Sequence, residues 1–474
     1  MVTCRSKLSK HLRFLAQLLM LWALGMWVIW ADPFGLSSAS ERALAEDISR
    51  SRAYVQPVPP APITVVNIDY DSIRALHESG RLEANDWPLT YRDHARILSR
   101  LVSRQNADDV PAAVFYDIFF ERPRTASGDM RRLGSVLGRI AQGTDQSSRP
   151  YPPVYLAGGG GKIPISDETY ALLNQPKLVA SVWDGLGDNY PLSRGLRDAD
   201  RETAVPQSAP SAAWALYQEL CRARGHGCGG IQAQDVLSTQ WVLREDRECG
   251  NWTTRVPRYV LLTIFRYLGF GGAPASASTD CLPVHQVRLS ELFLPDGGRL
   301  RPPYLGSGEP FVVLAGVIMP SLNDYHATPL YERLAGVYIH AMALENLDRL
   351  GGDYLRTREI RHVSSLVWLL LTTLVCIWRQ YFRQKAGRLI RARCGCSVQP
   401  QPSNQGLAGA AARQALGRLA RRAAWLSLWV LMVFAIYVLC YSILDIALQG
   451  WLFMIGLVSL LLFWDGASTA ARNP

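Results

Sequence analysis

The sequence predicts an α/β extracytoplasmic domain, built on a mixed sheet flanked by helices, together with four transmembrane α-helices. Three observations predict this fold class. Four segments are strongly apolar, the basic residues gather beside particular segments, and strand-like stretches alternate with helix-like stretches between the first two of them. The roughly 330 residues between those two segments are enough for one large or two modest hydrophobic cores.

The four apolar segments cover residues 14–31, 363–380, 423–444 and 445–464. A spanning helix needs about 20 mostly apolar residues. The third segment carries no charged residue, and the fourth carries only Asp445 at its start, where we expect an interfacial turn in preference to a functional acid within the membrane. Trp27, Trp30 and Trp378 supply interfacial aromatic side chains to the first two segments. We therefore expect four spanning helices.

The distribution of basic residues predicts the orientation. Residues 1–13 contain basic residues and no acid, so the amino terminus should be cytoplasmic and residues 32–362 exported to the periplasm of a bacterium. The stretch after the second segment again has basic residues and no Asp or Glu, which places the loop 381–422 and the tail 465–474 in the cytoplasm. The ten basic residues of the stretch 379–422 are Arg379, Arg383, Lys385, Arg388, Arg391, Arg393, Arg413, Arg418, Arg421 and Arg422.

Ten positive charges also equal the whole formal net charge of +10, so the rest of the chain is neutral in sum. The excess of basic over acidic residues therefore reflects the membrane topology, and we expect no nucleic-acid partner. The loop 381–422 could instead lie on anionic lipid headgroups.

The first segment could alternatively be a cleaved signal peptide. A cleavage site needs small residues one and three positions before the cut, whereas the segment ends in Val28, Ile29, Trp30 and Ala31. We expect an uncleaved anchor at the inner membrane.

Four of the nine cysteines lie in the exported domain: Cys221, Cys228, Cys249 and Cys281. An even number in an oxidising compartment predicts two disulfides, with all three pairings open. The alternative is free buried thiols. A zinc site is disfavoured because the C-x-x-C spacing is missing, and Cys394 and Cys396 in the basic loop are too few for a metal site. We expect no metal and no cofactor.

Within residues 32–362, β-branched apolar runs predict strands at 62–69, 112–120, 154–157, 178–183 and 310–317. Helical spacing predicts helices at 90–104, 128–141, 211–222, 254–268 and 334–350, with Thr90 as an N-cap. Such alternation favours a sheet covered on both faces.

Four blocks of this region resemble a known family. They are VVNIDYDSI (65–73), WPLTYRDHARILSRL (87–101), AAVFYDIFFERP (112–123) and VVLAGVIMPSLNDYHATPLYERLAGVYIHAMALENL (312–347). Together they resemble the CHASE type 2 extracytoplasmic sensor domain, which one amino-terminal and typically three carboxy-terminal transmembrane helices bracket. The resemblance covers most of residues 40–350 and the membrane segments.

The resemblance implies a sensory protein that detects an extracytoplasmic signal. Members usually carry a fused cytoplasmic output module, and we expect none here, so the signal should pass to a separate cytoplasmic or membrane partner. The loop 381–422 is the largest cytoplasmic surface for that partner. A homodimer is a further expectation from the resemblance.

Polar residues at strand ends and on one helix are candidates for a ligand site. Carboxyl ends of sheet strands are where ligands of α/β proteins bind. The alternative is that Asp69 and Asp324 cap helices or order turns and that His94 fills the apolar face of its helix. The candidates for a small-molecule or cation site are Asp69, Asp71, Arg92, His94, Asp117, Asp324 and His326.

Enzymatic motifs are weak. Asp69 and Asp71 after a strand resemble a phosphatase nucleophile motif, but no matching lysine and double-acid motif follows. The run GGGGK (158–162) has no Ser or Thr after Lys162 and predicts a flexible turn. We therefore expect a non-enzymatic membrane sensor. The alternatives are a scaffold or assembly subunit that binds envelope proteins through the exported domain, and an envelope enzyme.

Overall fold

The computed structural model describes residues 2–32, 50–246 with gaps, 249, 276–353 with short gaps, and 362–377 except 375, plus residues 427 and 435. The longest gaps within 50–246 are 182–188 and 197–204. The chain divides into two compact units, residues 49–357 and residues 1–48 with 358–474. The predicted helix 254–268 lies outside the described residues. So do the loop 381–422, the tail 465–474 and, apart from residues 427 and 435, the segments 423–444 and 445–464.

The unit of residues 49–357 is built on a six-stranded sheet with the order β11-β1-β12-β2-β3-β6. Every neighbouring pair in this sheet is parallel. β12 is buried along its whole length, as its central place between β1 and β2 requires. The strands are β1 (Ile63–Ile68), β2 (Ala113–Phe119), β3 (Val154–Ala157), β6 (Lys177–Val179), β11 (His285–Arg288) and β12 (Val312–Val317).

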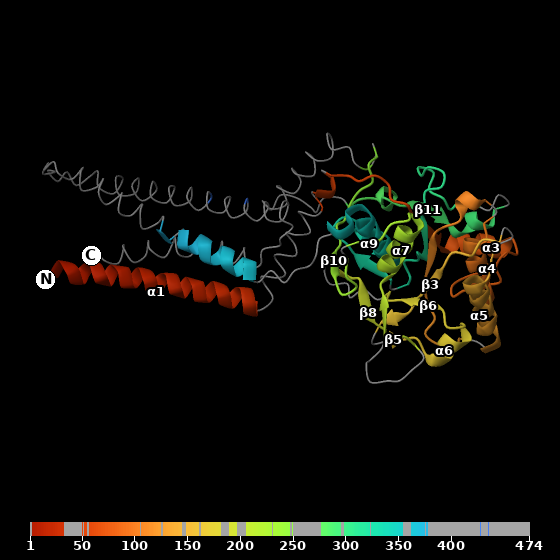
Figure 1. Cartoon of the computed structure of the whole chain (residues 1–474), viewed down its shortest axis with the longest axis horizontal. Coiled ribbons are helices and arrows are strands. Elements are labelled where there is room, and N and C mark those ends of the chain that lie inside the picture. Colours follow the sequence, from red (N-terminus) through yellow and green to blue (C-terminus); the bar gives the residue numbers. More distant parts are fainter. Residues whose placement is uncertain are drawn as a thin grey trace, which may run out of the picture. The chain divides into compact units, whose positions relative to one another are not determined.

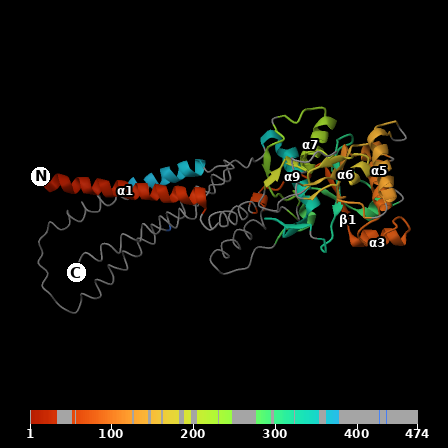
Figure 2. The same ribbon diagram turned by 90° about the horizontal axis from the view of Figure 1, so that it is seen from below.

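Helices cover both faces of the sheet, as the two views in Figure 1 and Figure 2 show. On one face α7 and α9 pack together and against β2 and β12, and on the other face lie α3, α4 and α5. Each face has its own hydrophobic core. The helices are α3 (Tyr70–Glu78), α4 (Tyr91–Val102), α5 (Ser127–Gln142), α6 (Asp167–Leu172), α7 (Ala212–Ala223) and α9 (Gly336–Leu350).

Short two-stranded antiparallel sheets and single 3-10 turns decorate this core. The pairs are β4 (Gly159–Gly160) with β5 (Ile163–Pro164), β7 (Asn189–Pro191) with β10 (Val236–Ser238), β8 (Ser193–Gly195) with β9 (Ser208–Pro210), and β13 (Tyr325–Ala327) with β14 (Arg333–Ala335). The 3-10 turns are η2 (Ala107–Asp109), η3 (Thr279–Cys281), η4 (Leu289–Phe293) and η5 (Gly351–Asp353).

The five predicted strands and four of the predicted helices are present within a few residues of their expected bounds. Thr90 caps α4 as expected, since its hydroxyl accepts a hydrogen bond from the Asp93 amide. Two features differ from expectation. The large sheet is wholly parallel, and among the described residues antiparallel pairing occurs in the small sheets and at the isolated bridge between Thr144 and Pro150. The helices α3 and α6 and the edge strand β11 were not predicted.

The second unit contains α1 (Val2–Ala31) and a helical segment at residues 362–374. These two helices lie side by side (Figure 1). The Trp368 indole donates a hydrogen bond to the Leu21 carbonyl at 3.3 Å, and the Trp30 indole donates to Ser365 Oγ at 3.3 Å. Gly25 makes this contact close, because a Cβ there would lie 1.6 Å from Trp368 Nε1. Over the residues described, no helix combines the length and apolar character required of a membrane span.

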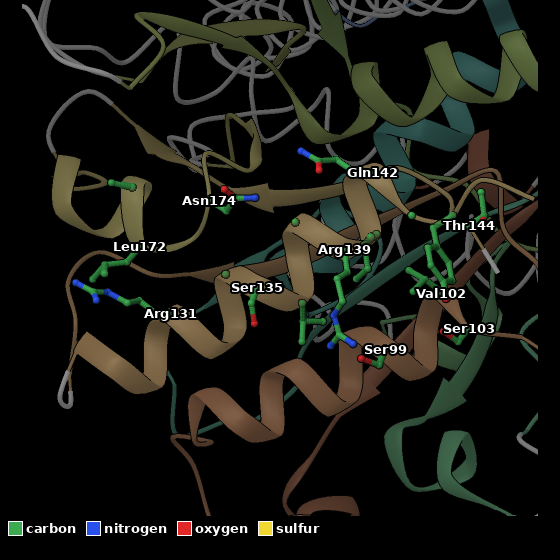
Figure 3. Close-up of a pocket in the computed structure, with 17 residues that line it drawn as sticks. Ser99, Val102, Ser103, Arg131, Ser135, Arg139, Gln142, Thr144, Leu172 and Asn174 are labelled. Carbon is green, nitrogen blue, oxygen red and sulfur yellow. The ribbon is translucent and has the colours of Figure 1, made fainter. Parts of the chain in front are cut away.

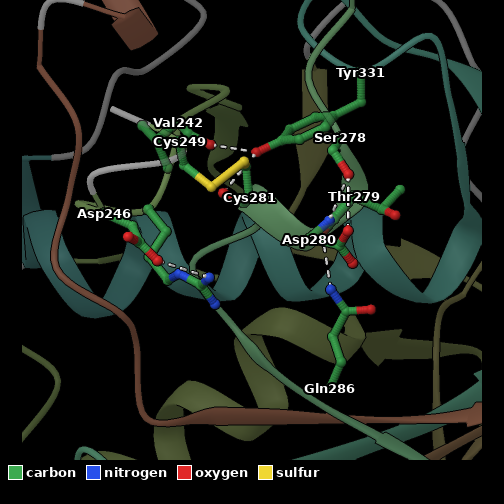
Figure 4. The surroundings of a disulfide bond; sticks show 10 residues. Val242, Asp246, Cys249, Ser278, Thr279, Asp280, Cys281, Gln286 and Tyr331 are labelled. Carbon is green, nitrogen blue, oxygen red and sulfur yellow. Dashed lines mark hydrogen bonds and ion pairs between the residues drawn. A yellow bond between two sulfur atoms is a disulfide. The ribbon is translucent and has the colours of Figure 1, made fainter. Parts of the chain in front are cut away.

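Two disulfides are formed, Cys221–Cys228 and Cys249–Cys281. This selects one of the three pairings that the sequence left open. Figure 4 shows the Cys249–Cys281 bond beside Tyr331. The Tyr331 hydroxyl is 2.7 Å from the Val242 carbonyl and 3.4 Å from that of Cys281. The bond thus ties the segment after β10 to the segment before β11.

Loss of the two disulfides should have unequal effects. Cys249 and Cys281 are 32 residues apart, whereas Cys221 and Cys228 are 7 apart. By the chain-entropy relation, the longer loop contributes about 4 kcal/mol and the shorter about 2.5 kcal/mol. We expect Cys249→Ser/Cys281→Ser to lower the unfolding free energy more than Cys221→Ser/Cys228→Ser, measured by denaturant titration. The reverse order would show that the contribution does not follow loop length.

Candidate functional site

A pocket of about 610 Å³ opens at the carboxyl-terminal edge of the parallel sheet. Its walls come from the ends of β2, β3 and β12, the loop before α4, the segment before β13 and the first turns of α9. Ligand pockets in proteins commonly have volumes of about 300–1,000 Å³. The lining residues with polar or aromatic side chains are Trp87, Asp117, Phe119, Glu121, Arg124, Ser181, Asp324, His326 and His340. We call this the strand-end pocket.

Two carboxyl groups define its chemistry. Asp117 lies on β2 in register with Gly316 of β12, so no side chain from that neighbour stands beside it. Burial raises the pKa of Asp117 well above its ordinary value, and the nearby Asp324 raises it further. A positive charge placed beside the two carboxyl groups would lower this pKa and favour the ionised form of Asp117. The pair is therefore suited to receive a cation.

Asp324 is placed by the start of α9. Its carbonyl accepts a hydrogen bond from the Gly336 amide at 3.0 Å, and a Cβ on Gly336 would lie 2.7 Å from Asp324 Oδ1. A glycine at position 336 is thus required for this approach. His326 Nε2 lies 3.7 Å from Asp324 Oδ1, which brings an imidazole to the same carboxylate.

His340 forms a buried wall of the pocket. Its Nδ1 lies 2.6 Å from the Tyr190 hydroxyl, which itself accepts a hydrogen bond from the Ala213 amide at 3.2 Å. The Tyr190 proton is therefore free to point at His340 Nδ1, which makes Nε2 the protonated nitrogen of the neutral ring. Burial lowers the pKa of His340 to about 4 and outweighs the nearby Asp324 carboxylate and the hydrogen bond with the Ser181 backbone, which both act to raise it. His340 is neutral at pH 7.

An aromatic wall comes from the loop before α4. Trp87 lines the pocket, and the loop that carries it is held by Asp93, which is fully buried. The Asp93 carboxylate accepts hydrogen bonds from the Glu83 amide at 2.8 Å and the Ala84 amide at 3.0 Å. Asp93 therefore positions this wall without touching the pocket.

The structure brings together three of the seven candidates, Asp117, Asp324 and His326. Asp69 instead caps α3, accepting a hydrogen bond from the Ser72 amide at 2.7 Å, as the alternative interpretation held. Asp71 is exposed in the first turn of α3. Neither lines the strand-end pocket.

The structure places Arg92 and His94 outside the strand-end pocket. Arg92 lies on the exposed side of α4, with its guanidinium 2.7 Å from the Glu83 carboxylate. His94 is fully buried on the apolar side of α4, and its Nδ1 is 2.7 Å from the Tyr116 hydroxyl. Burial and the nearby Arg124 lower the pKa of His94 to about 3. His94 is therefore a core residue, again as the alternative interpretation held.

Sequence reasoning missed Trp87, Glu121, Arg124, Ser181 and His340. A signal was available for Glu121 and Arg124, which follow the predicted strand 112–120, because a position after a strand is also what marked Asp71 and Asp324 as candidates. No such signal marked His340, because it lies within an apolar helix and reaches the pocket only through the packing of α9 on the sheet.

Carboxyl groups outnumber basic groups in the lining of the strand-end pocket. Asp324, Asp117 and Glu121 face one arginine, Arg124. The raised pKa of Asp117 favours its protonated form, and Glu121 is also paired with Arg122 at 3.3 Å. The aromatic side chains of Trp87 and Phe119 add faces that attract cations. Among the residues that the structure describes, no group of three or more His, Cys, Asp or Glu side chains is placed to hold a metal ion.

Asp117→Asn should stabilise the folded protein at neutral pH. Because the pKa of Asp117 is raised on folding, the folded state holds its proton more tightly than the unfolded state does. The favourable contribution of Asp117 to the free energy of unfolding is present at low pH and is lost as the pH rises through the pKa of Asp117 in the folded protein. We expect the melting temperature of Asp117→Asn to exceed that of the unmodified protein at pH 7 and the two to converge towards pH 4. The exposed Asp71→Asn is the control, and equal shifts in both variants would contradict the argument.

The comparisons with known proteins agree with this architecture. A family model described as the CHASE2 domain matches residues 18–378, which includes every strand and helix of the sheet unit. Searches of curated proteins and of solved structures found no match. CHASE2 domains are sensor domains, and such a domain is extracytoplasmic. Since the match spans most of its length, this chain belongs to the CHASE2 domain family.

Proposed function

We propose that this chain is an integral inner-membrane sensor that binds a small organic cation or zwitterion in the strand-end pocket of a periplasmic domain. The observation that carries the proposal is the pairing of Asp117 with Asp324 at the carboxyl edge of a parallel sheet, under a wall that contains Trp87. An ammonium group would satisfy both carboxylates and lie against the aromatic face. Arg124 would meet the carboxylate of a zwitterionic ligand.

The size of the pocket favours an organic ligand. About 610 Å³ is far more than a single ion occupies, and it matches the volumes of small-molecule sites. The pocket also favours a sensor over a scaffold subunit. A scaffold would be indicated by an exposed apolar patch without a polar pocket. The proposed role is binding without turnover.

The membrane arrangement rests on the sequence. Four apolar segments, a basic amino terminus and the acid-free loop 381–422 support a multi-pass protein with residues 32–362 in the periplasm. Within the second unit, the packing of Trp368 into the space left by Gly25 joins the first two apolar segments. A ligand that binds one arrangement of the domain more tightly would shift these two helices relative to each other. This shift would move the loop 381–422.

The ligand proposal is tested by thermal shift. We would purify the full-length protein in nanodiscs and add choline, betaine, putrescine and γ-aminobutyrate in turn. We expect at least one of them to raise the melting temperature, and Asp324→Asn to abolish that rise. Asp71→Asn is the matched control because Asp71 is an exposed acid outside the pocket. Stabilisation that persists in Asp324→Asn/Asp117→Asn would place the ligand elsewhere.

The relay proposal needs a different measurement. Crosslinking of the tagged protein in native membranes, followed by mass spectrometry, identifies what contacts residues 379–422. A kinase, cyclase or other regulator attached to these residues would support a relay to a separate protein. Capture of lipid alone by the loop, together with envelope proteins on the exported domain, would favour the scaffold.

A further inference from the structure

A second polar pocket lies along α5, lined by residues of α4, α5 and the segment around α6. It has a volume of about 950 Å³ and shares no lining residue with the strand-end pocket. A neighbouring depression of about 660 Å³ continues it, since both are lined by Ser99, Ser103, Ser135, Val136 and Arg139. We call the two together the arginine groove. Figure 3 shows Arg139 of α5 and Ser99 of α4 facing each other across it.

The charge of the arginine groove has one sign. Its lining contains no Asp or Glu. The arginines that line it are Arg81, Arg92, Arg96, Arg100, Arg131, Arg132 and Arg139. The strand-end pocket is instead lined by three carboxyl groups and one arginine, so the two cavities cannot bind the same ligand by the same contacts.

Most of these arginines are not neutralised. Arg92 and Arg96 share the Glu83 carboxylate, and Arg96 also contacts Asp93. The other five have no carboxylate within 4.0 Å in the part of the chain that the structure describes. Elsewhere in the domain several arginines do have such a partner, including Arg224 with Asp348 and Arg349 with Glu345. All five are exposed, and Arg100 also lies over the Phe293 ring, 5.6 Å from its centroid. An anion in the groove would be attracted by several of these positive charges at once.

Neutral donors stand beside these charges. The hydroxyl of Ser103 and the side chains of Gln142, Thr144 and Asn174 line the same cavity. Asn174 can approach α5 closely because position 138 is glycine, where a Cβ would lie 2.4 Å from Asn174 Nδ2. Guanidinium forks with hydroxyl and amide donors are the groups that proteins use to bind phosphate oxygens.

We propose that the arginine groove is a second binding site, specific for a phosphate-bearing anion and separate from the strand-end pocket. The phosphate can come from a soluble phosphoester or from an anionic lipid headgroup, because the contacts would be the same. The site makes this protein a receptor for two ligands of opposite charge.

The test measures anion binding to the full-length protein in nanodiscs of neutral phosphatidylcholine. One arm titrates inositol hexakisphosphate by calorimetry, and the other floats the nanodiscs with vesicles containing phosphatidylglycerol or only phosphatidylcholine. We expect saturable binding in one arm, weakening as salt is added. Binding of the soluble probe identifies a phosphoester source, and binding only to phosphatidylglycerol vesicles identifies a lipid source.

Variants locate the site. Arg131→Gln/Arg132→Gln/Arg139→Gln should weaken binding at least about tenfold, since hydrogen bonds to charged groups are lost. Arg139→Lys keeps the charge without the fork and should give a smaller loss. The control Arg74→Gln/Arg288→Gln/Arg333→Gln removes the same charge from exposed positions outside the groove. Equal losses in both triple variants, or no binding of either probe, would overturn the proposal.

Discussion

Asp93→Ala is expected to destabilise the sheet unit by about 2–5 kcal/mol, because each of two backbone amides would lose its acceptor at a cost of about 1–3 kcal/mol. Asp93 is fully buried, and its carboxylate accepts hydrogen bonds from two backbone amides, from the Thr90 hydroxyl at 2.8 Å and from Arg96 at 3.1 Å. Alanine would leave the amides of Glu83 and Ala84 without acceptors. Denaturant unfolding followed by tryptophan fluorescence measures the loss.

The same substitution should loosen the wall of the strand-end pocket. The loop from Glu83 to Thr90 carries Trp87, and Asp93 holds both of its ends. We expect faster hydrogen exchange in residues 83–90 of Asp93→Ala under conditions where the protein remains folded. Asp71→Ala, an exposed acid on the neighbouring helix, should change stability by less than about 0.5 kcal/mol. A loss in Asp93→Ala no larger than in Asp71→Ala would contradict the assigned role.

The protein should also lose on the order of 5 kcal/mol of stability between pH 7 and pH 4.5 through two buried histidines. Burial lowers the pKa of His94 to about 3 and that of His340 to about 4. Below the unfolded pKa of about 6.5, the unfolded chain binds protons at both rings while the folded protein does not. The contribution of the two histidines to stability is therefore fully present above the unfolded pKa. It falls as the pH drops towards the pKa values of the two rings in the folded protein. The raised pKa of Asp117 acts in the opposite direction.

The variant His94→Asn/His340→Asn tests the origin of this acid sensitivity. Asparagine cannot titrate here, and its oxygen can accept from the tyrosine hydroxyls that now lie near Nδ1 of each ring. The variant should be less stable at pH 7, because it leaves cavities, but should lose much less stability on acidification. His77→Asn, at an exposed position on α3, should retain the full loss. Identical pH slopes in all three proteins would show that other groups govern acid unfolding.

The strands of the sheet centre could be predicted because their side chains face cores on both sides. The runs at β1, β2 and β12 are almost wholly apolar, which is the pattern of a buried parallel strand. β11 reads His-Gln-Val-Arg and lies at the sheet edge, where one buried valine is enough, so no apolar run marks it. α3 was not predicted, although helix capping by Asp69 was one of the two interpretations of that residue, because no helix was assigned to the residues that follow it.

The site could be predicted in part for similar reasons. Asp324 and His326 follow a strand closely, and Asp117 lies within one near its end, so topology brings these three to one edge. Arg92 and His94 share α4 but point to its two sides, and only the position of the helix on the sheet decides that neither reaches the pocket. The disulfide pairing depends on contacts between distant segments, which spacing alone does not specify.

The most direct test of the sensor proposal is hydrogen exchange with mass spectrometry on the full-length protein in nanodiscs, with and without the ammonium compound that gives the largest thermal shift. We expect protection of peptides containing Asp117, Asp324 and His340, and altered exchange in residues 14–31 and 362–377, where the two packed helices lie. Asp324→Asn should abolish both changes. Protection confined to other parts of the domain, or protection of the pocket with both helices unchanged, would contradict the claim that this pocket controls the membrane-proximal helices.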